Sequence, residues 1–314
     1  MDDYTAKTKE WLEGRFSTAD EAGIYVAHQP IYGFKKGHCD TGYLERYILT
    51  YQIMKALSSL KFSTLLDVGG AEGYKSSLAA QMFTTWAVSC DLSEEACKRT
   101  REIFRTDSAA ADIHDLPFSD GAFEVVLCSE TLEHVTDIRR ATLELLRVAG
   151  KAVVITVPTE SHETVERNIE EGIPHAHINS IDLRTFESVA SNGCRIISRK
   201  MLSAPVRRFE DVLEPARKNP NGKYPKAVFD LYNAFVPALG KLAGAGSIDC
   251  AIWLDGLISK TPARCGALLC VLLKDGGAWT ESSGHRISIK HVTDFKVPYH
   301  FLGCQAQGRE AGNL

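Results

Sequence analysis

The sequence lacks the long apolar run that a membrane-spanning helix needs. Its longest apolar stretch, 266–273, covers eight residues, whereas roughly 20 are needed to cross a bilayer. The N-terminal segment MDDYTAKTKEWLEGR contains no apolar region of the kind found in a signal peptide. We therefore expect a soluble, cytoplasmic protein without a membrane span.

Runs of lysine and arginine are also absent. The chain has 36 basic and 40 acidic residues and a formal net charge of −4. A dedicated nucleic-acid binder usually carries a basic footprint, so we do not expect nucleic acid as a partner. The nine cysteines include no C-x-x-C pair, which argues against a zinc site or a disulfide framework and favours reduced thiols packed as small apolar groups.

What the sequence does contain is an alternation of short apolar runs and segments of helical length. With 314 residues, 44% of them hydrophobic and 24% charged, the chain is neither disordered nor a coiled coil. The alternation predicts an α/β fold, in which a doubly wound, mostly parallel sheet has helices on both faces. The predicted strands are 64–68, 86–90, 123–128, 152–157, 195–198 and 267–273.

Helix signals stand between and before these strands. Apolar spacing predicts a helix from Tyr43 to Leu60. Ser93 is a predicted N-cap, and Thr136 or Asp137 is another. The alternating segment HRISIKHV, 285–292, predicts an extra edge strand.

The clearest motif is LLDVGGAEGYKSSLAAQMF, which begins at Leu65. A buried strand carrying Asp67 runs into a glycine turn and then a helix. In an open parallel sheet, ligands bind in the crevice beyond the carboxyl ends of the strands. The turn does not match the dinucleotide fingerprint, because Ala71 and Tyr74 stand where glycines are required when counting starts at Gly69. The P-loop pattern is missing too, so a pyrophosphate ligand is not expected.

Two downstream carboxylates indicate a nucleoside instead. Asp91 ends the second strand, where it can accept hydrogen bonds from both hydroxyls of a ribose. Asp112 follows a short third strand, where it can accept from an exocyclic adenine amine. The fourth strand then leads into Ser129, Glu130 and Thr131 at the same edge of the sheet.

Taken together, these segments resemble a class I S-adenosylmethionine-dependent methyltransferase of the small-molecule, methyltransferase-11-like type. The resemblance covers roughly Thr64 to Asp275. It implies a seven-stranded sheet with a reversed last hairpin, formed by the strands near Arg195 and Ala267. One departure is Ala71, where many members have glycine. The five matching segments are LLDVGGAEG, CDLS, ADIHDLPF, EVVLCSETLEHV and LRVAGKAVVITVP.

The same resemblance implies S-adenosyl-L-methionine as the cofactor and places its parts. The glycine turn approaches the methionine part, Asp91 takes the ribose, and Asp112 takes the adenine side. Leu92 and Ile113 flank the adenine ring, while Ser129 and Glu130 line the opening towards the methyl group. The implied cofactor-binding residues are Asp67, Gly69, Gly70, Ala71, Gly73, Asp91, Leu92, Asp112, Ile113, Ser129 and Glu130.

Methyl transfer to a hydroxyl benefits from a general base, and histidines are the candidates. His134 follows the fourth strand, His175 and His177 lie after the fifth, and His28 belongs to the N-terminal extension. Each also has a purely structural interpretation as a surface or packing residue. Glu130, Glu133 and His134 do not form an octahedral oxygen set, so we expect no metal.

These expectations divide the chain into five parts. They are an N-terminal lid and helical extension (1–61), a cofactor-binding core (62–202), a helical insertion that caps the substrate (203–262), the last core strand (263–275) and a C-terminal extension (276–314).

The predicted function is methyl transfer to a small molecule, with the hydroxyl of a sugar, lipid or natural product as the leading acceptor. Two alternatives stay open. One is methylation of protein or RNA, although no DPPY or NPPY segment follows the fourth strand. The other is a non-catalytic scaffold that retains the cofactor fold. A homodimer is also left open.

Overall fold

Seven strands of the described chain form one sheet in the order β3-β2-β1-β4-β5-β7-β6. The computed structural model describes residues 2–19, 41–190, 193–201, 266–280 and 287–295, with some single positions outside these ranges. The strands are β1 (Thr64–Val68), β2 (Trp86–Asp91), β3 (Asp107–Ala110), β4 (Phe123–Ser129), β5 (Ala149–Pro158), β6 (Cys194–Met201) and β7 (Ala267–Lys274). The first five pair in parallel, and β7 runs antiparallel to both neighbours. The predicted sheet with its reversed last hairpin is confirmed.

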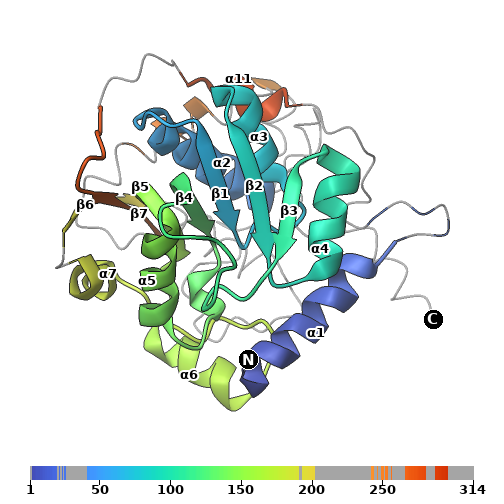
Figure 1. Ribbon diagram of the computed structural model, residues 1–314. Coiled ribbons are helices and arrows are strands. Elements are labelled where there is room, and N and C mark those ends of the chain that lie inside the picture. The colour runs from blue at the N-terminus through green and yellow to red at the C-terminus, as the bar shows by residue number, and fades with distance from the viewer. Residues whose placement is uncertain are drawn as a thin grey trace.

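Helices cover both faces of this sheet (Figure 1). Successive strand residues point to opposite faces, so Leu65 packs into one core and Leu66 into the other. The first core is closed by α2 (Thr41–Ser58), α3 (Tyr74–Phe83) and α11 (Ile289–Thr293), and the second by α5 (Ile138–Val148) and α7 (Leu183–Ala190). Apolar burial on both sides explains why the central strands are apolar throughout.

The helix signals in the sequence are largely confirmed. Ser93 caps α4 (Glu94–Arg99), because its side chain accepts from the backbone N–H of Ala96. Asp137, rather than Thr136, caps α5. The helix expected from Tyr43 is α2, which begins two residues earlier and ends at Ser58.

The edge strand expected at 285–292 is wrong over its described part. Residues Ile289–Thr293 form α11, whose first turn is fixed by a capping box between Ser288 and His291. Its buried side chains, Ile289 and Val292, are three residues apart and pack against the core beside α2. Local capping and the apolar face of the core therefore outweigh the alternation of the sequence.

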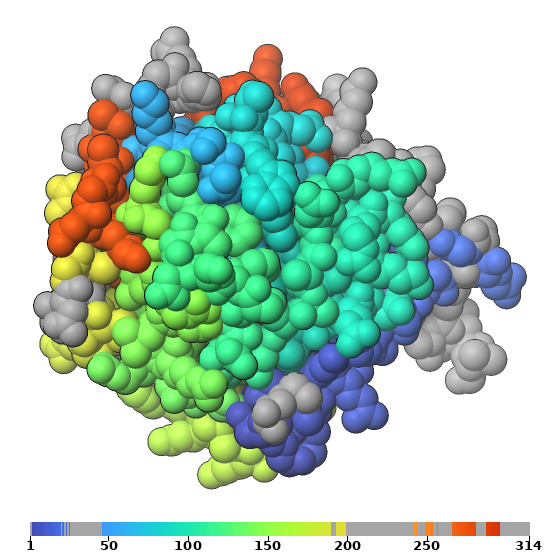
Figure 2. All heavy atoms as spheres, viewed as in Figure 1, coloured from blue at the N-terminus to red at the C-terminus, as the bar shows by residue number. Residues whose placement is uncertain are grey.

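A helix that the periodicity did not predict, α1 (Asp3–Ser17), runs along the edge of the sheet at which β1, β2 and β3 end (Figure 1). Leu12 and Phe16 pack against Ala96 of α4. The carboxylate of Glu13 accepts hydrogen bonds from the Ser93 hydroxyl and from two backbone N–H groups of α4. In Figure 2 the dark blue atoms of α1 lie directly against the core along this edge. Helix α1 thus lies across the carboxyl ends of these strands.

Several sequence expectations fall outside the described residues. They include the loop from Ile24 to Lys36 apart from Tyr25, most of the insertion 203–262 and most of the C-terminal extension. Among the described helices, none combines the length and hydrophobicity that crossing a bilayer requires. The described cysteines carry free thiols, and Cys90, Cys97, Cys128 and Cys270 are buried, as expected for small apolar groups.

Candidate functional site

The glycine turn between β1 and α3 is held tightly between its neighbours. The backbone N–H groups of Gly69 and Gly70 both donate to the carbonyl of Cys90 at the end of β2. Gly69 has a φ of +73°, and a Cβ placed on it would lie 2.1 Å from the side-chain oxygen of Thr131. A side chain at this position is excluded on both grounds. The turn is therefore packed directly against the loop that follows β4.

Asp91 braces this turn. Its carboxylate accepts from the backbone N–H of Ala71 at 2.9 Å and from that of Ser93 at 3.0 Å. Ala71 has a φ of +50°, a conformation that favours glycine, so this contact helps to stabilise the turn at the point where the sequence departs from the family. Burial raises the pKa of Asp91 to about 6, although the backbone hydrogen bonds oppose the shift. Each carboxylate oxygen keeps a second lone pair for another donor.

A cleft of about 530 Å³ opens beside this point, under α1. Its lining includes Leu92 and Asp112, which the sequence assigned to the adenine side, together with Asp2 and Lys9 of the N-terminal segment. Asp112 also accepts from the backbone N–H of His114 and lies 2.6 Å from its Nδ1. Asp112 is thus part of a local turn and of the cleft wall at once.

Asp67 and Lys75, on either side of the glycine turn, are both buried, and their charges influence each other. Asp67 is 1% exposed, and its Oδ2 has no hydrogen-bond partner among the described residues. Burial raises the pKa of Asp67 to about 6, while the charge of Lys75 counteracts that shift. Burial likewise lowers the pKa of Lys75. A buried carboxylate oxygen without a donor is expensive, so this position fits a ligand that brings a donor.

The hydrogen-bond acceptors at this edge of the sheet fit an adenosyl cofactor with an amino acid part. The turn leaves no room for side chains, and Asp67 presents an acceptor without a donor. Asp91 retains lone pairs and directly precedes Leu92, which lines the cleft. Three further residues of the predicted cofactor set have contacts within the protein, and their roles towards the cofactor stay predictions. The Ser129 hydroxyl pairs with Thr156 at 2.8 Å, and the side chain of Ile113 is buried in the core next to α5. Glu130 has a φ of +56° and donates its backbone N–H to Thr156.

Three of the four predicted histidines meet at one place, whereas His28 lies outside the described residues. The ring of His134 stacks on His175 with 3.9 Å between centroids, and it meets the ring of His177 edge-on at 4.9 Å. Trp11 of α1 stacks on the other face of His175 at 4.9 Å. Strands β4 and β5 supply the loops that bring the three histidines together, and α1 packs against them.

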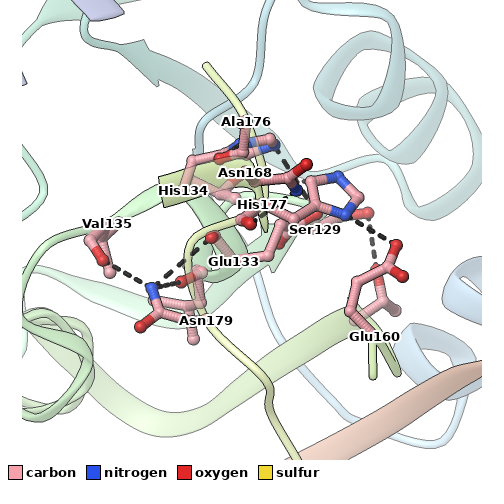
Figure 3. Close-up of polar contacts among 12 residues, drawn as sticks. Ser129, Glu133, His134, Val135, Glu160, Asn168, Ala176, His177 and Asn179 are labelled. Carbon is pink, nitrogen blue, oxygen red and sulfur yellow. Dashed lines mark hydrogen bonds and ion pairs between the residues drawn. The ribbon is translucent and has the colours of Figure 1, made fainter. Parts of the chain in front are cut away.

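Hydrogen bonds to oxygen fix the tautomer of two of these rings (Figure 3). His134 Nδ1 lies 3.0 Å from the carbonyl of Ala176, and His177 Nδ1 lies 2.8 Å from Glu160 Oε1. A carbonyl only accepts, so Nδ1 of His134 carries the proton and its Nε2 presents a lone pair. Burial lowers the pKa of His134 to about 3, with the charge of His177 adding to the effect.

Two carboxylates support this cluster; sequence reasoning weighed Glu133 only as a metal ligand and did not identify Glu160. Glu133, in the short 3-10 helix Leu132–His134, is 1% exposed, and its Oε1 lies 3.8 Å from His134 Nε2. Glu160, at the start of the segment after β5, holds His177. Glu133 was recognisable as a neighbour of His134, but the pairing of Glu160 with His177 depends on how the loop folds back over 17 residues.

Comparison with known proteins supports the family that the motifs indicated. Residues 66–155 match the family described as "Methyltransferase domain". Tocopherol O-methyltransferase of Arabidopsis thaliana is 32% identical over 119 residues, which cover 36% of this chain and 33% of that protein. Norajmaline N-methyltransferase of Rauvolfia serpentina is 28% identical over 119 residues, or 36% and 41% of the two chains. The match thus spans less than half the length of these relatives.

A solved structure agrees at the level of the fold. The [4+2]-cyclase SpnF superposes with a TM-score of 0.50 and 15% identity, covering 85% of this chain and 93% of that one. Residues 66–155 therefore match a methyltransferase domain, as the predicted resemblance implied, and this match supports the prediction of S-adenosylmethionine as the cofactor.

Proposed function

We propose that this chain is a class I S-adenosylmethionine-dependent methyltransferase and that it methylates a hydroxyl of a small molecule, such as a sugar, lipid or natural product. The observation that carries the proposal is the cluster of Glu133, His134 and His177 one loop away from the glycine turn. Thr131 touches Gly69, and Glu133 follows two residues later. An acceptor placed there meets two imidazoles and a carboxylate next to the cofactor turn.

On the cofactor side, the bound group supplies an activated methyl on a sulfonium. The residues proposed to hold it are those of the turn at Gly69–Gly73, with Asp67 for the amino group, Asp91 for the ribose and Asp112 for the adenine. Alignment of donor and acceptor accounts for most of the acceleration of such a displacement, roughly 7–11 kcal/mol in well-oriented systems. The braced turn and the packed cluster provide that alignment on rigid elements.

On the acceptor side, the three imidazoles do not act alike. His175 lies between Trp11 and His134 and serves as a packing layer. His177, held by Glu160, is the residue proposed to take or direct the hydroxyl proton, with His134 beside it. Tocopherol O-methyltransferase is named for transfer to oxygen, which supports a hydroxyl acceptor. Because α1 lies across the edge at which the strands end, we expect a compact acceptor to fit there better than a large polymer.

The test is calorimetry with S-adenosylhomocysteine followed by a screen of hydroxylated small molecules, with RNA and protein acceptors included, in which release of S-adenosylhomocysteine is measured. We expect saturable binding of one equivalent and turnover with small hydroxyl compounds. Binding without turnover on any small molecule, but with turnover on RNA or protein, would replace the proposed acceptor. An absence of binding would favour the scaffold alternative.

We expect Asp91→Ala to weaken the binding of S-adenosylhomocysteine by about 10- to 100-fold, because a buried hydroxyl pair loses its acceptor. The backbone N–H groups of Ala71 and Ser93 lose theirs as well, so thermal unfolding must be recorded in parallel. Asp107→Ala, on the exposed side chain that pairs with Trp86 at the edge of the sheet, is the control. Unchanged affinity in Asp91→Ala would remove the ribose assignment.

We also expect the binding of S-adenosylhomocysteine to weaken as pH falls from 7.5 to 5. Burial raises the pKa of both Asp91 and Asp67 to about 6. Each carboxylate therefore takes up a proton as pH falls through that value, and it then loses the charge that makes it a strong acceptor. Calorimetry across this range measures the effect. Asp91→Asn should bind weakly at both ends and show a flatter pH dependence, whereas an equally steep profile in this variant would assign the titration to another group.

A further inference from the structure

The donor atoms beside the glycine turn form a set that is not explained by proton transfer alone. One ligand-type atom from each of Glu133, His134 and His177 lies within 4.8 Å of those of the other two. The sequence-based expectation of no metal considered Glu130, Glu133 and His134 only. The fold adds His177 from a loop 43 residues further along the chain, and this changes the donor set from one imidazole to two.

The histidines are held in the way that metal-binding histidines are held. Nδ1 of His134 is engaged by the carbonyl of Ala176, and Nδ1 of His177 is engaged by the carboxylate of Glu160. Such oxygen partners fix the ring orientation and make the opposite nitrogen a better ligand. Nε2 of His134, the nitrogen without a proton, lies 3.8 Å from the buried carboxylate of Glu133, so two ligand-type atoms lie close together.

The cluster is also ordered in advance. The stack of Trp11, His175 and His134 fixes the plane of the His134 ring. Asn179 donates to the carbonyl of Val135 at 2.6 Å and ties the segment carrying His177 to the segment after the 3-10 helix. The backbone N–H of Ile178 donates to the carbonyl of Glu133. Ligands about 2.1 Å from a shared ion lie roughly 3–3.5 Å apart in a tetrahedral site, so small side-chain rotations suffice to close this set.

We propose that Glu133, His134 and His177 bind a divalent first-row transition-metal ion such as Zn²⁺, Mn²⁺ or Co²⁺. Two imidazoles and one carboxylate suit these ions better than Mg²⁺ or Ca²⁺, which favour oxygen ligands. Three protein ligands leave coordination positions open, as in catalytic sites. The role of the ion rests on the proposed function: it binds the acceptor oxygen and lowers the pKa of that hydroxyl, and His177 then acts through the ion.

The experiment is a titration of the full-length, metal-free protein with Co²⁺ alone, followed by visible absorption and calorimetry. We expect one equivalent to bind and to give the d–d bands of a site with nitrogen ligands. Glu133→Gln and His177→Ala should abolish this signal. Glu160 is not one of the three ligands but orients His177, so Glu160→Gln should weaken Co²⁺ binding by about 10- to 100-fold. His162→Ala, an exposed histidine at the start of α6 (His162–Glu170), is the control and should bind normally.

The outcomes are separable. Absence of Co²⁺ binding, or equal binding by wild type and Glu133→Gln, overturns the site. Displacement of Co²⁺ by an equal concentration of Mg²⁺ overturns the choice of metal class. If Glu133→Gln does not fold, judged by circular dichroism, Glu160→Gln carries the comparison because Glu160 is partly exposed. Calorimetry with S-adenosylhomocysteine on the same samples tests the proposed function independently, since cofactor binding without Co²⁺ binding rejects the ion only.

Discussion

Arg99→Met is expected to lower the free energy of unfolding by about 3–5 kcal/mol, because it removes the cation from a buried ion pair. Arg99 is 0% exposed and Glu72 is 2% exposed, and their side chains meet at 2.7 Å. Arg99 also donates to the carbonyl of Thr18 and lies over the ring of Phe16. Urea unfolding followed by circular dichroism measures the loss.

This ion pair joins three parts of the chain that are far apart in sequence. Glu72 belongs to the glycine turn, Arg99 ends α4, and Thr18 follows α1. Breaking the pair should therefore loosen α1 and the cofactor turn together. We expect weaker binding of S-adenosylhomocysteine in Arg99→Met, and faster hydrogen exchange in α1, in addition to the loss of global stability.

Two further variants identify the cause. The double variant Arg99→Met, Glu72→Leu removes both charges and should be more stable than Arg99→Met alone, because the buried negative charge is removed together with its counter-charge. Lys98→Met, next to Arg99 on the same helix, breaks an ion pair with Glu95 whose side chains are 48% and 34% exposed. It should cost less than about 1 kcal/mol. A similarly small loss in Arg99→Met would mean that water reaches Glu72.

Local signals made much of the fold predictable. The apolar runs located β1 and β4 within a residue, and the caps at Ser93 and Asp137 need only a side-chain oxygen two or three residues before the N–H that it accepts from. The glycine turn was recognisable for the same reason, since a positive φ at Gly69 is a property of a single residue. Such features depend only on residues that are adjacent in the sequence, so they can be predicted without knowledge of the tertiary structure.

Contacts between distant segments account for what the sequence did not reveal. The pairing of Arg99 with Glu72 spans 27 positions, and that of Glu13 with the N-terminus of α4 spans about 80. Nothing in the local sequence around Glu13 marks it as a cap for another helix. At 285–292 the opposite error arose, because alternation predicted a strand where packing against α2 and a capping box produce α11.

The cluster of His134, His175 and His177 was predictable in part from local signals and depends in part on contacts between distant segments. Its histidines were chosen because the loops after parallel strands converge at one edge, and the structure brings His134, His175 and His177 together there. Their division of roles could not be predicted. It depends on Trp11 arriving from α1 to stack on His175, and on Glu160 turning back to hold His177.

His177→Ala is expected to reduce turnover by about 10²- to 10⁴-fold, the usual contribution of a group that assists proton transfer, while the affinity for S-adenosylhomocysteine stays close to that of wild type. The ring contacts His134, whereas the glycine turn assigned to the cofactor packs against Thr131, three residues before His134. Steady-state kinetics with the acceptor found by the screen, together with calorimetry, measures the two quantities separately.

Matched variants decide what His177 does. Glu160→Gln keeps the shape of the partner but removes its charge, so we expect an intermediate loss of kcat and little change in the KM for the cofactor. His162→Ala removes an exposed histidine nearby and should leave kcat unchanged. If His177→Ala turns over the acceptor at the wild-type rate, neither proton transfer nor metal binding at this ring contributes to the reaction. If cofactor affinity falls in parallel with kcat, the ring supports the cofactor turn instead.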